Sequence, residues 1–458
     1  MNHFAPRPTK STKTITVVSP KGFRSWLRSQ KATVKGWVSA QDFSGRQGEI
    51  AKIYSGDKKV KAVVVGVEPD GSPFPYAHLP AALGSGRWAF DKSLDDAAAN
   101  DAALGWALGT YVFDRYKKSS TKFGTLVWPE AADQAKVERL AASTAYARDL
   151  VSTPAGDLGP TALADSAKAL AKEFGAKCTV IVGDKLLAEN YPAVHAVGRA
   201  CTDAPRLIDI VWGDAAAPKV TLVGKGVCFD TGGLDIKPSS GMLLMKKDMG
   251  GAAMVLAIAR AVMDAKLNVR LRVLVPAVEN SVAGNAFHPQ DVLQTRKGLT
   301  VEVGNTDAEG RLILCDALAE ADSEKPELIL DFATLTGAAR VALGTDMPAL
   351  FSNDDDLANE LLAAGQKTGD LLWRMPLHQP YKRSLDSTIA DINNVGGSRY
   401  GGAITAALFL ESFVSSSTAW AHVDLMAYNL ENRPGRPVGG EAMGVRAAYA
   451  MLESRYGA

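Results

Sequence analysis

The stretch that decides the fold runs from residue 220 to residue 278 and contains VTLVG (220–224), GAAMVLAIARAVMDA (251–265) and VRLRVLVPAV (269–278). The first and last runs are short, apolar and rich in β-branched residues, which predicts buried strands. The middle run has the length and alanine content of a helix. A strand, a helix and a second strand in this order favour an α/β fold with a largely parallel sheet.

The same alternation continues on both sides of this stretch. Three further strand-like runs are CTVIVGD (178–184), RLIDIVWG (206–213) and ELILDFATL (327–335). A helical pattern follows Pro160, and we expect Thr161 to cap that helix. The sequence therefore predicts a large C-terminal α/β domain with a mostly parallel mixed sheet flanked by helices. Ligands of such sheets bind beyond the carboxyl ends of the strands, so the residues there are the candidates for chemistry.

Three consecutive segments make up the predicted domain organisation. Residues 1–134 form a small N-terminal α/β domain, residues 135–152 a linker helix, and residues 153–458 the large domain with the candidate site. The N-terminal domain contains two β-branched runs and an alanine-rich helix, which are TITVVS (14–19), KVKAVVVGVE (59–68) and LDDAAANDAALGWALGTYVFDRY (94–116).

Charge and composition narrow the classes of function. The 458 residues include 51 Lys and Arg against 50 Asp and Glu, for a formal net charge of +1, which argues against a dedicated nucleic-acid or membrane-surface protein. No apolar run approaches the ~20 residues of a membrane helix, and the N-terminal MNHFAPRPTKSTKT lacks a secretory h-region, so we expect a cytoplasmic protein. The four Cys and six His form no CxxC or HExxH pattern, so any metal site should consist mostly of carboxylates.

Two motifs combine acids, bases and glycines after predicted strands. They are GKGVCFDTGGLDIKPSSGMLLMKKDMGGAA (224–253) and NTDAEGRL (305–312). A solvated loop with ordinary ion pairs is one interpretation of the first motif, and capping of the following helix explains one acid of the second. A second acid and Arg311 ahead of a buried-looking helix need partners or a metal. The residues alone leave a carboxylate site for Mg²⁺, Mn²⁺ or Zn²⁺ as an open alternative.

Both motifs resemble those of the M17 leucyl aminopeptidases (cytosol aminopeptidases), which are di-metal exopeptidases. NTDAEGRL is close to diagnostic, and the likeness continues through PELILDFATLTGA, NVGGSRYGGAITAALFL, WAHVD and RPGRPVGGEAMGVRA, covering about residues 140 to 455. The resemblance implies an enzyme that releases Leu- or Met-like N-terminal residues from short peptides. By position alone, it also implies that residues 1–134 are the family's variable N-terminal domain.

The resemblance assigns a role to each motif residue. It implies two divalent ions, Mn²⁺ or Zn²⁺ with Mg²⁺ and Co²⁺ as alternatives, whose ligands are Lys225, Asp230, Asp248, Asp307 and Glu309. A hydroxide bridging the two metals is the implied nucleophile. Lys237 is implied to stabilise the oxyanion, and Arg311 to hold a bicarbonate ion that acts as general base.

The resemblance also implies a substrate pocket lined by Met245, Thr334, Leu335, Gly337 and Met426. Many members read Asp-x-Ala-Gly after WAH, whereas this chain has Met426 in that segment, so we expect a narrower or reshaped pocket. We expect His288 to be a surface or loop histidine. His422 and Asp424 are expected to orient the end of a strand rather than bind metal.

Two other functions remain open at this point. A di-metal phosphoesterase would use a similar carboxylate cluster, although the chain contains no GxxxxGK[ST] loop. The other is a hexameric DNA-binding or regulatory protein with a moonlighting peptidase, to which a net charge of +1 gives no support. The resemblance implies a homohexamer, and no nucleic-acid or membrane partner is expected.

Overall fold

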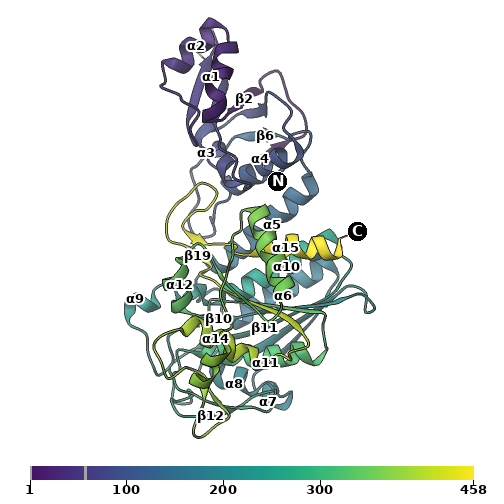
Figure 1. Ribbon diagram of the computed structural model, residues 1–458, viewed down its shortest axis with the longest axis vertical. Helices are drawn as coiled ribbons and strands as arrows, with labels where there is room; N and C mark the ends of the chain where they lie inside the picture. The colour runs from purple at the N-terminus through teal and green to yellow at the C-terminus, as the bar shows by residue number, and fades with distance from the viewer. Residues whose placement is uncertain (1–2, 56–58, 458) are drawn as a thin grey trace. The chain divides into compact units, whose positions relative to one another are not determined.

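The computed structural model describes residues 3–55 and 59–457, and it divides into two compact units. Unit 1 comprises Met1–Ala142, Lys367–Gly369 and Glu431–Val438, and unit 2 comprises Ser143–Gln366, Asp370–Leu430 and Gly439–Ala458. Helix α5 (Gln134–Ser152) contains the point where the chain passes from one unit to the other (Figure 1). Unit 1 also includes Lys367–Gly369 and Glu431–Val438, two short segments from later in the chain. The sequence analysis, which divides the chain into consecutive domains, does not include them in the N-terminal domain. The domain limits drawn from the sequence stay a prediction.

In its described residues, unit 1 is built on a six-stranded sheet in the order β1-β6-β5-β2-β4-β3, parallel except for β3. The strands are β1 (Phe4–Ala5), β2 (Lys13–Val18), β3 (Ile50–Tyr54), β4 (Val60–Gly66), β5 (Arg87–Phe90) and β6 (Thr125–Val127). The helices are α1 (Pro20–Ser29), α2 (Ala32–Ser39), the 3-10 turn η1 (Phe74–Tyr76), α3 (Leu79–Leu83) and α4 (Asp96–Gly109). Helix α4 begins after Asp95, which caps it, and ends at Gly109, so the helix predicted over 94–116 is too long at its C-terminal end.

The described part of unit 2 contains a nine-stranded mixed sheet in the order β16-β15-β18-β14-β9-β11-β8-β7, with β10 pairing β11. Its strands are β7 (Lys177–Val182), β8 (Arg206–Trp212), β9 (Lys219–Gly224), β10 (Gly226–Asp230), β11 (Arg270–Asn280), β14 (Leu328–Ala333), β15 (Ala349–Ser352), β16 (Trp373–Arg374) and β18 (Ala419–Asp424). The central order β18-β14-β9-β11 is parallel, and β8 and β15 add antiparallel strands on either side. Five short strands lie outside this sheet: β12 (Val292–Gln294), β13 (Thr300–Glu302), β17 (Ile392–Asn393), β19 (Tyr428–Asn429) and β20 (Gly439–Gly440).

Helices cover both faces of the large sheet. Figure 1 shows α6, α10 and α15 on one face and α8, α11 and α14 on the other. The helical elements of unit 2 are α6 (Pro160–Phe174), α7 (Lys185–Ala188), α8 (Pro192–Gly198), α9 (Ser239–Met242), η2 (Met245–Met249), α10 (Gly250–Ala265), α11 (Glu309–Ser323), α12 (Gly337–Leu343), α13 (Asp355–Thr368), η3 (Gln379–Leu385), α14 (Gly402–Glu411) and α15 (Val445–Tyr456). The α/β class and the mostly parallel mixed sheet predicted from the sequence are confirmed.

The stretch 220–278 forms the centre of unit 2. Strands β9 and β11 pair in parallel, with Leu274 opposite Val223, and α10 connects the chain between them. Most of α10 is buried, because its alanines and glycines let it pack closely: a Cβ on Gly251 would lie 2.0 Å from the carbonyl oxygen of Phe332. This close packing fixes the carboxyl ends of β9 and β14, where the candidate site lies.

One local prediction is wrong. Helix α6 begins at Pro160 with Gly159 as its N-cap residue, so Thr161 is not the cap. Pro160 occupies the first helical position, where its missing N–H costs nothing. The amide and hydroxyl of Thr161 instead donate to the carboxylate of Asp203. Of the described helices, none combines the length and hydrophobicity required to cross a bilayer.

Candidate active site

The first motif forms a reversing turn beyond the carboxyl ends of β9 and β10. Lys225 follows β9, and Asp230 is the last residue of β10. Gly232 has a φ of 89°, and a Cβ there would lie 2.4 Å from the carbonyl oxygen of Asp235, so this turn requires glycine. The amide of Lys237 then donates to the carbonyl of Thr231 at 2.9 Å. The turn therefore returns Lys237 to the side of Asp230.

Two lysines join the two motifs. Lys225 Nζ lies 2.6 Å from Asp248 Oδ2 and 3.0 Å from Glu309 Oε1. Lys237 Nζ lies 2.8 Å from Asp230 Oδ2 and also contacts Asp307 Oδ1. Each lysine thus pairs one acid of residues 224–253 with one acid of residues 305–312.

Three carboxylates converge at one point. Asp230, Asp307 and Glu309 each offer an oxygen, and these oxygens all lie within 4.8 Å of one another. Asp230 and Glu309 are buried, with exposed fractions of 2% and 1%, whereas 32% of the Asp307 side chain is exposed. Hard oxygen donors this close together, with one side open, fit a divalent cation, because a metal relieves the mutual repulsion that the two lysines leave.

The pKa values of these acids show that repulsion. Burial and the negative charge of Asp230 raise the pKa of Glu309 to about 8, although the positive charge of Lys225 lowers it in part. Burial and the charge of Asp230 raise the pKa of Asp307 to about 6, against Lys237. For Asp248, burial acts upward, but the charges of Lys225 and Lys247 outweigh it and lower the pKa.

The basic residues of the site respond in two ways. Burial opposes the charge on Lys225, yet the neighbouring carboxylates, chiefly Asp248, raise its pKa above the ordinary lysine value. The same balance of burial against Asp230 raises the pKa of Lys237. Arg311 has no adjacent carboxylate in hydrogen-bonding contact among the described residues, and burial lowers its pKa to about 10. Both lysines are ammonium ions when only protein groups surround them.

The second motif begins helix α11 without serving as its cap. Glu309 is the first residue of α11, and the N-cap position is Ala308. Asp307 receives no helix amide; its own N–H donates to Asn305 Oδ1 at 2.7 Å. Helix capping, the simpler interpretation of these acids, therefore does not account for their positions.

Three polar residues that the sequence did not single out hold the motifs together. Asn280, at the end of β11, donates from Nδ2 to Asp230 Oδ1 at 2.9 Å and to the carbonyl of Thr306 at 3.1 Å. The hydroxyl of Thr306 donates to the carbonyl of Gly232 at 2.6 Å. Asn394 accepts from Gly304 and donates to the carbonyl of Asn305, at 2.8 Å in both cases. The sequence offers one signal for Asn280, which is a polar residue at the end of a buried apolar strand. The sequence around Asn394 offers no such signal.

The structure brings some predicted pocket residues to the cluster. Thr334, just after β14, donates from its hydroxyl to Asp248 Oδ1 at 2.8 Å, and its carbonyl accepts from Lys225 Nζ at 3.3 Å. Met245 is buried at the start of η2, two positions before Lys247, and Gly337 begins α12 in an exposed position.

Other predicted positions meet different groups. The amide of Leu335 donates to Asp424 Oδ1 at 2.9 Å, and Thr336 donates to both oxygens of that carboxylate. Asp424 thus holds the turn between β14 and α12, as expected of a residue that orients a strand end. Met426 is buried in the turn after β18, and its contact with substrate stays a prediction.

The remaining histidines and cysteines lie apart from this chemistry. The His288 side chain is 58% exposed, which confirms it as a surface histidine. His422 Nδ1 lies 2.5 Å from Asp331 Oδ1 inside the sheet; burial acts to lower its pKa, but the Asp331 charge outweighs this and raises it. The four cysteines are free.

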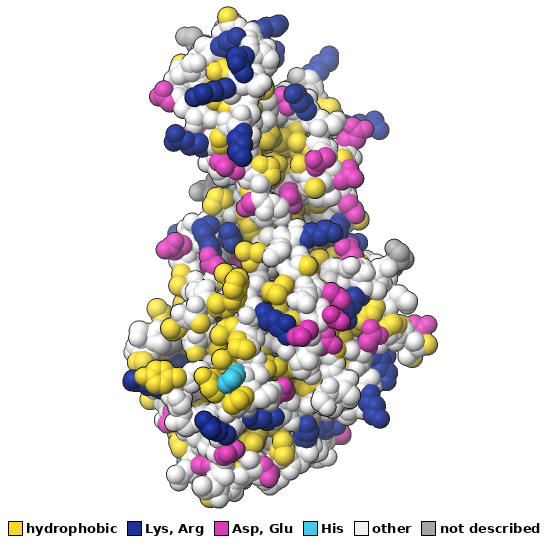
Figure 2. Space-filling model, viewed as in Figure 1, with side chains coloured by type: hydrophobic (Ala, Val, Ile, Leu, Met, Phe, Trp, Pro, Cys, Tyr) yellow, Lys and Arg dark blue, Asp and Glu magenta, His cyan; other side chains and the backbone are white. Residues whose placement is uncertain are grey.

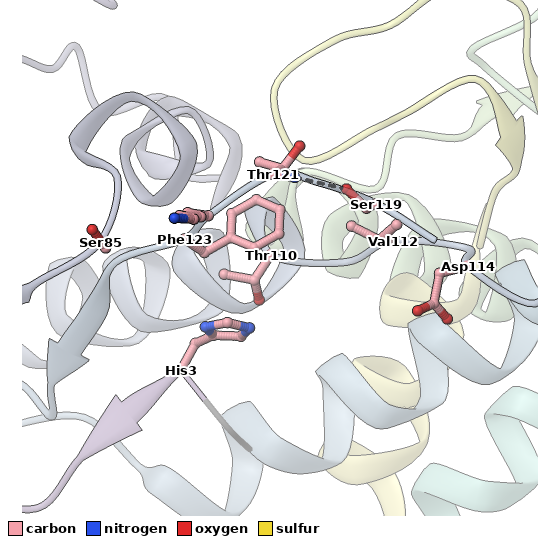
Figure 3. Close-up of a pocket in the computed structure, with 9 residues that line it drawn as sticks. His3, Ser85, Thr110, Val112, Asp114, Ser119, Thr121 and Phe123 are labelled. Carbon is pink, nitrogen blue, oxygen red and sulfur yellow. Dashed lines mark hydrogen bonds between the residues drawn. The ribbon is translucent and has the colours of Figure 1, made fainter. Parts of the chain in front are cut away.

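Unit 1 contains a cavity of about 670 Å³ with a different lining. Figure 3 shows His3 and Phe123 facing each other in this pocket, with ring centroids 5.5 Å apart, and the amide of Thr121 donating to Ser119 Oγ at 3.1 Å. Its lining has one acid, Asp114, so it lacks the paired carboxylates that metal hydrolysis needs. The candidate active site is the cluster in unit 2.

Buried carboxylates paired with lysines, at the carboxyl ends of parallel strands in an α/β sheet, define a metal-dependent hydrolase. The cytosol aminopeptidase family, catalytic domain, matches residues 145–449, and the M17 aminopeptidase N-terminal domain matches residues 14–129. The chain belongs to the M17 cytosol aminopeptidase family. It is a metal-dependent aminopeptidase, a hydrolase of peptide bonds.

Individual relatives agree with this assignment. A probable cytosol aminopeptidase of Xanthomonas oryzae pv. oryzae (strain MAFF 311018) is 44% identical over 334 residues, which are 70% of this chain and 68% of that protein. A crystal structure of cytosol aminopeptidase from Coxiella burnetii has a TM-score of 0.95 and 47% identity, covering 100% of both chains. The bottromycin maturation enzyme BotP in complex with Mn has a TM-score of 0.88 and 34% identity, covering 97% of this chain and 99% of that one.

Proposed function

We propose that the enzyme releases apolar N-terminal residues, such as Leu or Met, from short peptides by a two-metal mechanism. The observation that carries this proposal is the convergence of Asp230, Asp307 and Glu309, whose ligand oxygens lie within 4.8 Å of one another between two lysines. Three such acids with access from one side suit hydrolysis better than a closed structural metal site, which would satisfy all of its ligands internally.

The five proposed metal ligands are supplied by the ends of β9 and β10, by η2 and by the start of α11. Asp230, Asp307 and Glu309 would hold the ions together with Lys225 and Asp248. The donor set of carboxylates and one amine suits Mn²⁺ or Zn²⁺, with Mg²⁺ and Co²⁺ as alternatives. Lys225 would bind as the neutral amine, and the positive charge of the ions would favour the loss of its proton. When bound, the ions would supply Lewis-acid activation of the scissile carbonyl and of the attacking water.

Lys237 is the proposed oxyanion donor. Its ammonium reaches the cluster from the turn after Asp230. Burial lowers the pKa of Lys237, but the charge of Asp230 raises it more, so the side chain stays charged at neutral pH. A fixed positive charge at that point stabilises the negative charge that develops on the carbonyl oxygen.

Arg311 is the proposed holder of a bicarbonate ion, which would serve as general base. Its Nη1 donates to the carbonyl of Asn394 at 2.6 Å, which fixes the guanidinium, and its buried Nε has no hydrogen-bond partner among the described residues. A guanidinium with a free donor beside the acids suits a planar oxyanion. The acids of the cluster are proposed metal ligands, so a base from outside the chain is required.

The apolar preference rests on the pocket positions. Met245, Thr334, Leu335 and Gly337 follow from the family's motifs, and Met426 is this chain's departure from them. A bulkier side chain at Met426 would shorten the pocket, and a change of one methylene is worth about 1–3 kcal/mol of discrimination.

The test is hydrolysis of Leu-p-nitroanilide with Mn²⁺, before and after EDTA, followed by readdition of Zn²⁺, Mn²⁺, Mg²⁺ or Co²⁺. We expect EDTA to abolish hydrolysis and one or more ions to restore it. Activity that resists the chelator would exclude the two-metal mechanism. A panel of aminoacyl-p-nitroanilides measures the preferred N-terminal residue in the same experiment.

We further propose a homohexamer in the cytoplasm. Hydrophobic side chains gather on the face of unit 2 shown in Figure 2, and large apolar residues exposed in this unit include Ile236, Leu243, Val341 and Tyr400. Apolar surface of this kind is typical of an interface between subunits. Light scattering that gives the mass of a monomer would contradict the assembly. The location is supported by relatives named cytosol aminopeptidase.

A further inference from the structure

A lysine that makes only a long ion pair lies beside the proposed substrate pocket. Lys247 belongs to η2, and 2% of its side chain is exposed. Its Nζ is 4.0 Å from Asp248 Oδ1, beyond hydrogen-bonding distance. That oxygen already accepts from Thr334, and the other oxygen of Asp248 pairs with Lys225. A buried ammonium with one distant carboxylate and no hydrogen-bond acceptor among the described residues is costly, so this position favours a further anion.

A second cation lies nearby on α12. Arg340 is half-buried, and within the described part of the chain its guanidinium makes no ion pair or hydrogen bond. Its Nη2 lies 3.7 Å from the point that a Cβ on Gly337 would occupy, so it borders the open start of the helix. Burial lowers the pKa of Lys247 to about 8, Asp248 opposes that shift, and the charge of Arg340 adds to it.

The other acid that acts on Lys247 is already engaged. Asp424 is buried and accepts three hydrogen bonds, from the amides of Leu335 and Thr336 at 2.9 and 3.1 Å and from the Thr336 hydroxyl at 2.6 Å. Gly337, directly after this turn, is exposed. The exposed start of α12 therefore borders Arg340, and both carboxylates that act on Lys247 have other partners.

We propose that Lys247 and Arg340 form a carboxylate-binding subsite beside Gly337 that recognises an anionic group of the peptide substrate. This inference rests on the aminopeptidase function proposed above. An acidic N-terminal side chain in this subsite would replace the apolar preference, whereas the C-terminal carboxylate of a dipeptide would leave that preference in place. A guanidinium binds a carboxylate through two parallel hydrogen bonds, and the ammonium adds a third donor. The carboxylate comes from an acidic N-terminal side chain or from the C-terminus of a dipeptide, and two pairs of substrates separate these sources.

The first pair is Glu-p-nitroanilide and Gln-p-nitroanilide, and the second is Leu-Gly and Leu-Gly-amide, all at saturating Mn²⁺. The wild type should prefer the charged member of one pair. Arg340→Gln should lower that ratio of kcat/KM by about 10-fold or more, mainly through KM, because a buried ion-pair partner is lost. Arg340→Lys should keep part of the preference. Arg383→Gln, which removes an exposed charge of unit 2, should keep the full ratio.

Lys247→Met gives an independent readout. It should lower the same ratio and raise the Tm, because an unpaired buried charge is replaced by an apolar chain of similar length. A lower Tm with an unchanged ratio would show that Lys247 is structural and would overturn the subsite, as would hydrolysis of all four substrates with no preference for a carboxylate. A wild type that fails to hydrolyse even Leu-p-nitroanilide with any metal would instead refute the proposed function, and the subsite with it.

Discussion

The Gly310→Ala substitution tests whether the position of the Lys225 side chain controls activity. Gly310 is the second residue of α11, and a Cβ there would lie 2.4 Å from Lys225 Cε and 2.7 Å from Nζ. Carbon atoms pack at ~3.5 Å or more, so the amine must move by about 1 Å. A displacement of that size in an active site costs on the order of 10²-fold in rate, or about 2.7 kcal/mol of transition-state stabilisation.

The same substitution should leave the fold intact. Alanine is favoured over glycine within a helix by up to about 1 kcal/mol, and the atoms that it displaces are the end of a flexible side chain. We therefore expect kcat/KM for Leu-p-nitroanilide to fall about 100-fold, with weaker activation by Mn²⁺ and an unchanged or higher Tm.

The matched control is Gly36→Ala in α2, where a Cβ would meet nothing within 4 Å. It should leave kcat/KM unchanged. If kcat/KM of Gly310→Ala stays within about threefold of the wild type, displacement of Lys225 by ~1 Å is harmless. That result would refute the expected 100-fold loss. A loss of activity that accompanies a loss of Tm would assign the effect to folding, and would equally refute the reasoning.

Three further predictions concern the charged groups of the site. Lys237→Met should lower kcat by roughly 10²-fold or more with little change in KM for Leu-p-nitroanilide, as expected for a donor that acts in the transition state. Arg311→Met should abolish any stimulation by bicarbonate in carbonate-depleted buffer, and equal stimulation of both proteins would exclude Arg311 as its holder. Because burial raises the pKa of Glu309 from 4.5 to about 8, the metal-free native protein binds a proton that the unfolded chain releases, so its stability falls as pH rises through this interval. Glu309→Gln in EDTA should flatten that slope of Tm against pH, and an unaltered slope would contradict the assignment.

The strands and the two motifs could be predicted because their signals are local. VTLVG (220–224) and VRLRVLVPAV (269–278) are β-branched apolar runs of strand length, and both form strands of the central sheet. The alanine-rich pattern of 94–116 is also local, but it does not show that the chain leaves the helix at Gly109. A helix end depends on what the next residues contact, which periodicity does not report.

The supporting shell could not be predicted, because its partners are far apart in the sequence. Asn394 holds the backbone on both sides of Asp307 from more than 80 residues away, and Asn280 reaches Asp230 across 50 residues. A single asparagine carries no pattern of its own, so only the fold identifies Asn394, and the end of a buried strand is the one local signal for Asn280. The length of the Lys247–Asp248 ion pair, 4.0 Å, is equally invisible in the sequence, where the adjacent acid suggests a close pair.

The arrangement of the two lysines indicates that the acids are positioned by the chain before any metal binds. Lys237 ties Asp230 to Asp307, and Lys225 ties Asp248 to Glu309, so each lysine links the two motifs. In small zinc domains the metal supplies the folding energy itself. Here a sheet with a large apolar core and two ion-paired lysines already holds the proposed ligands, so a bound metal would exchange partners within a formed site. The whole chain has 51 basic and 50 acidic residues. The candidate site shows a similar balance, because each of its four carboxylates is paired with Lys225 or Lys237.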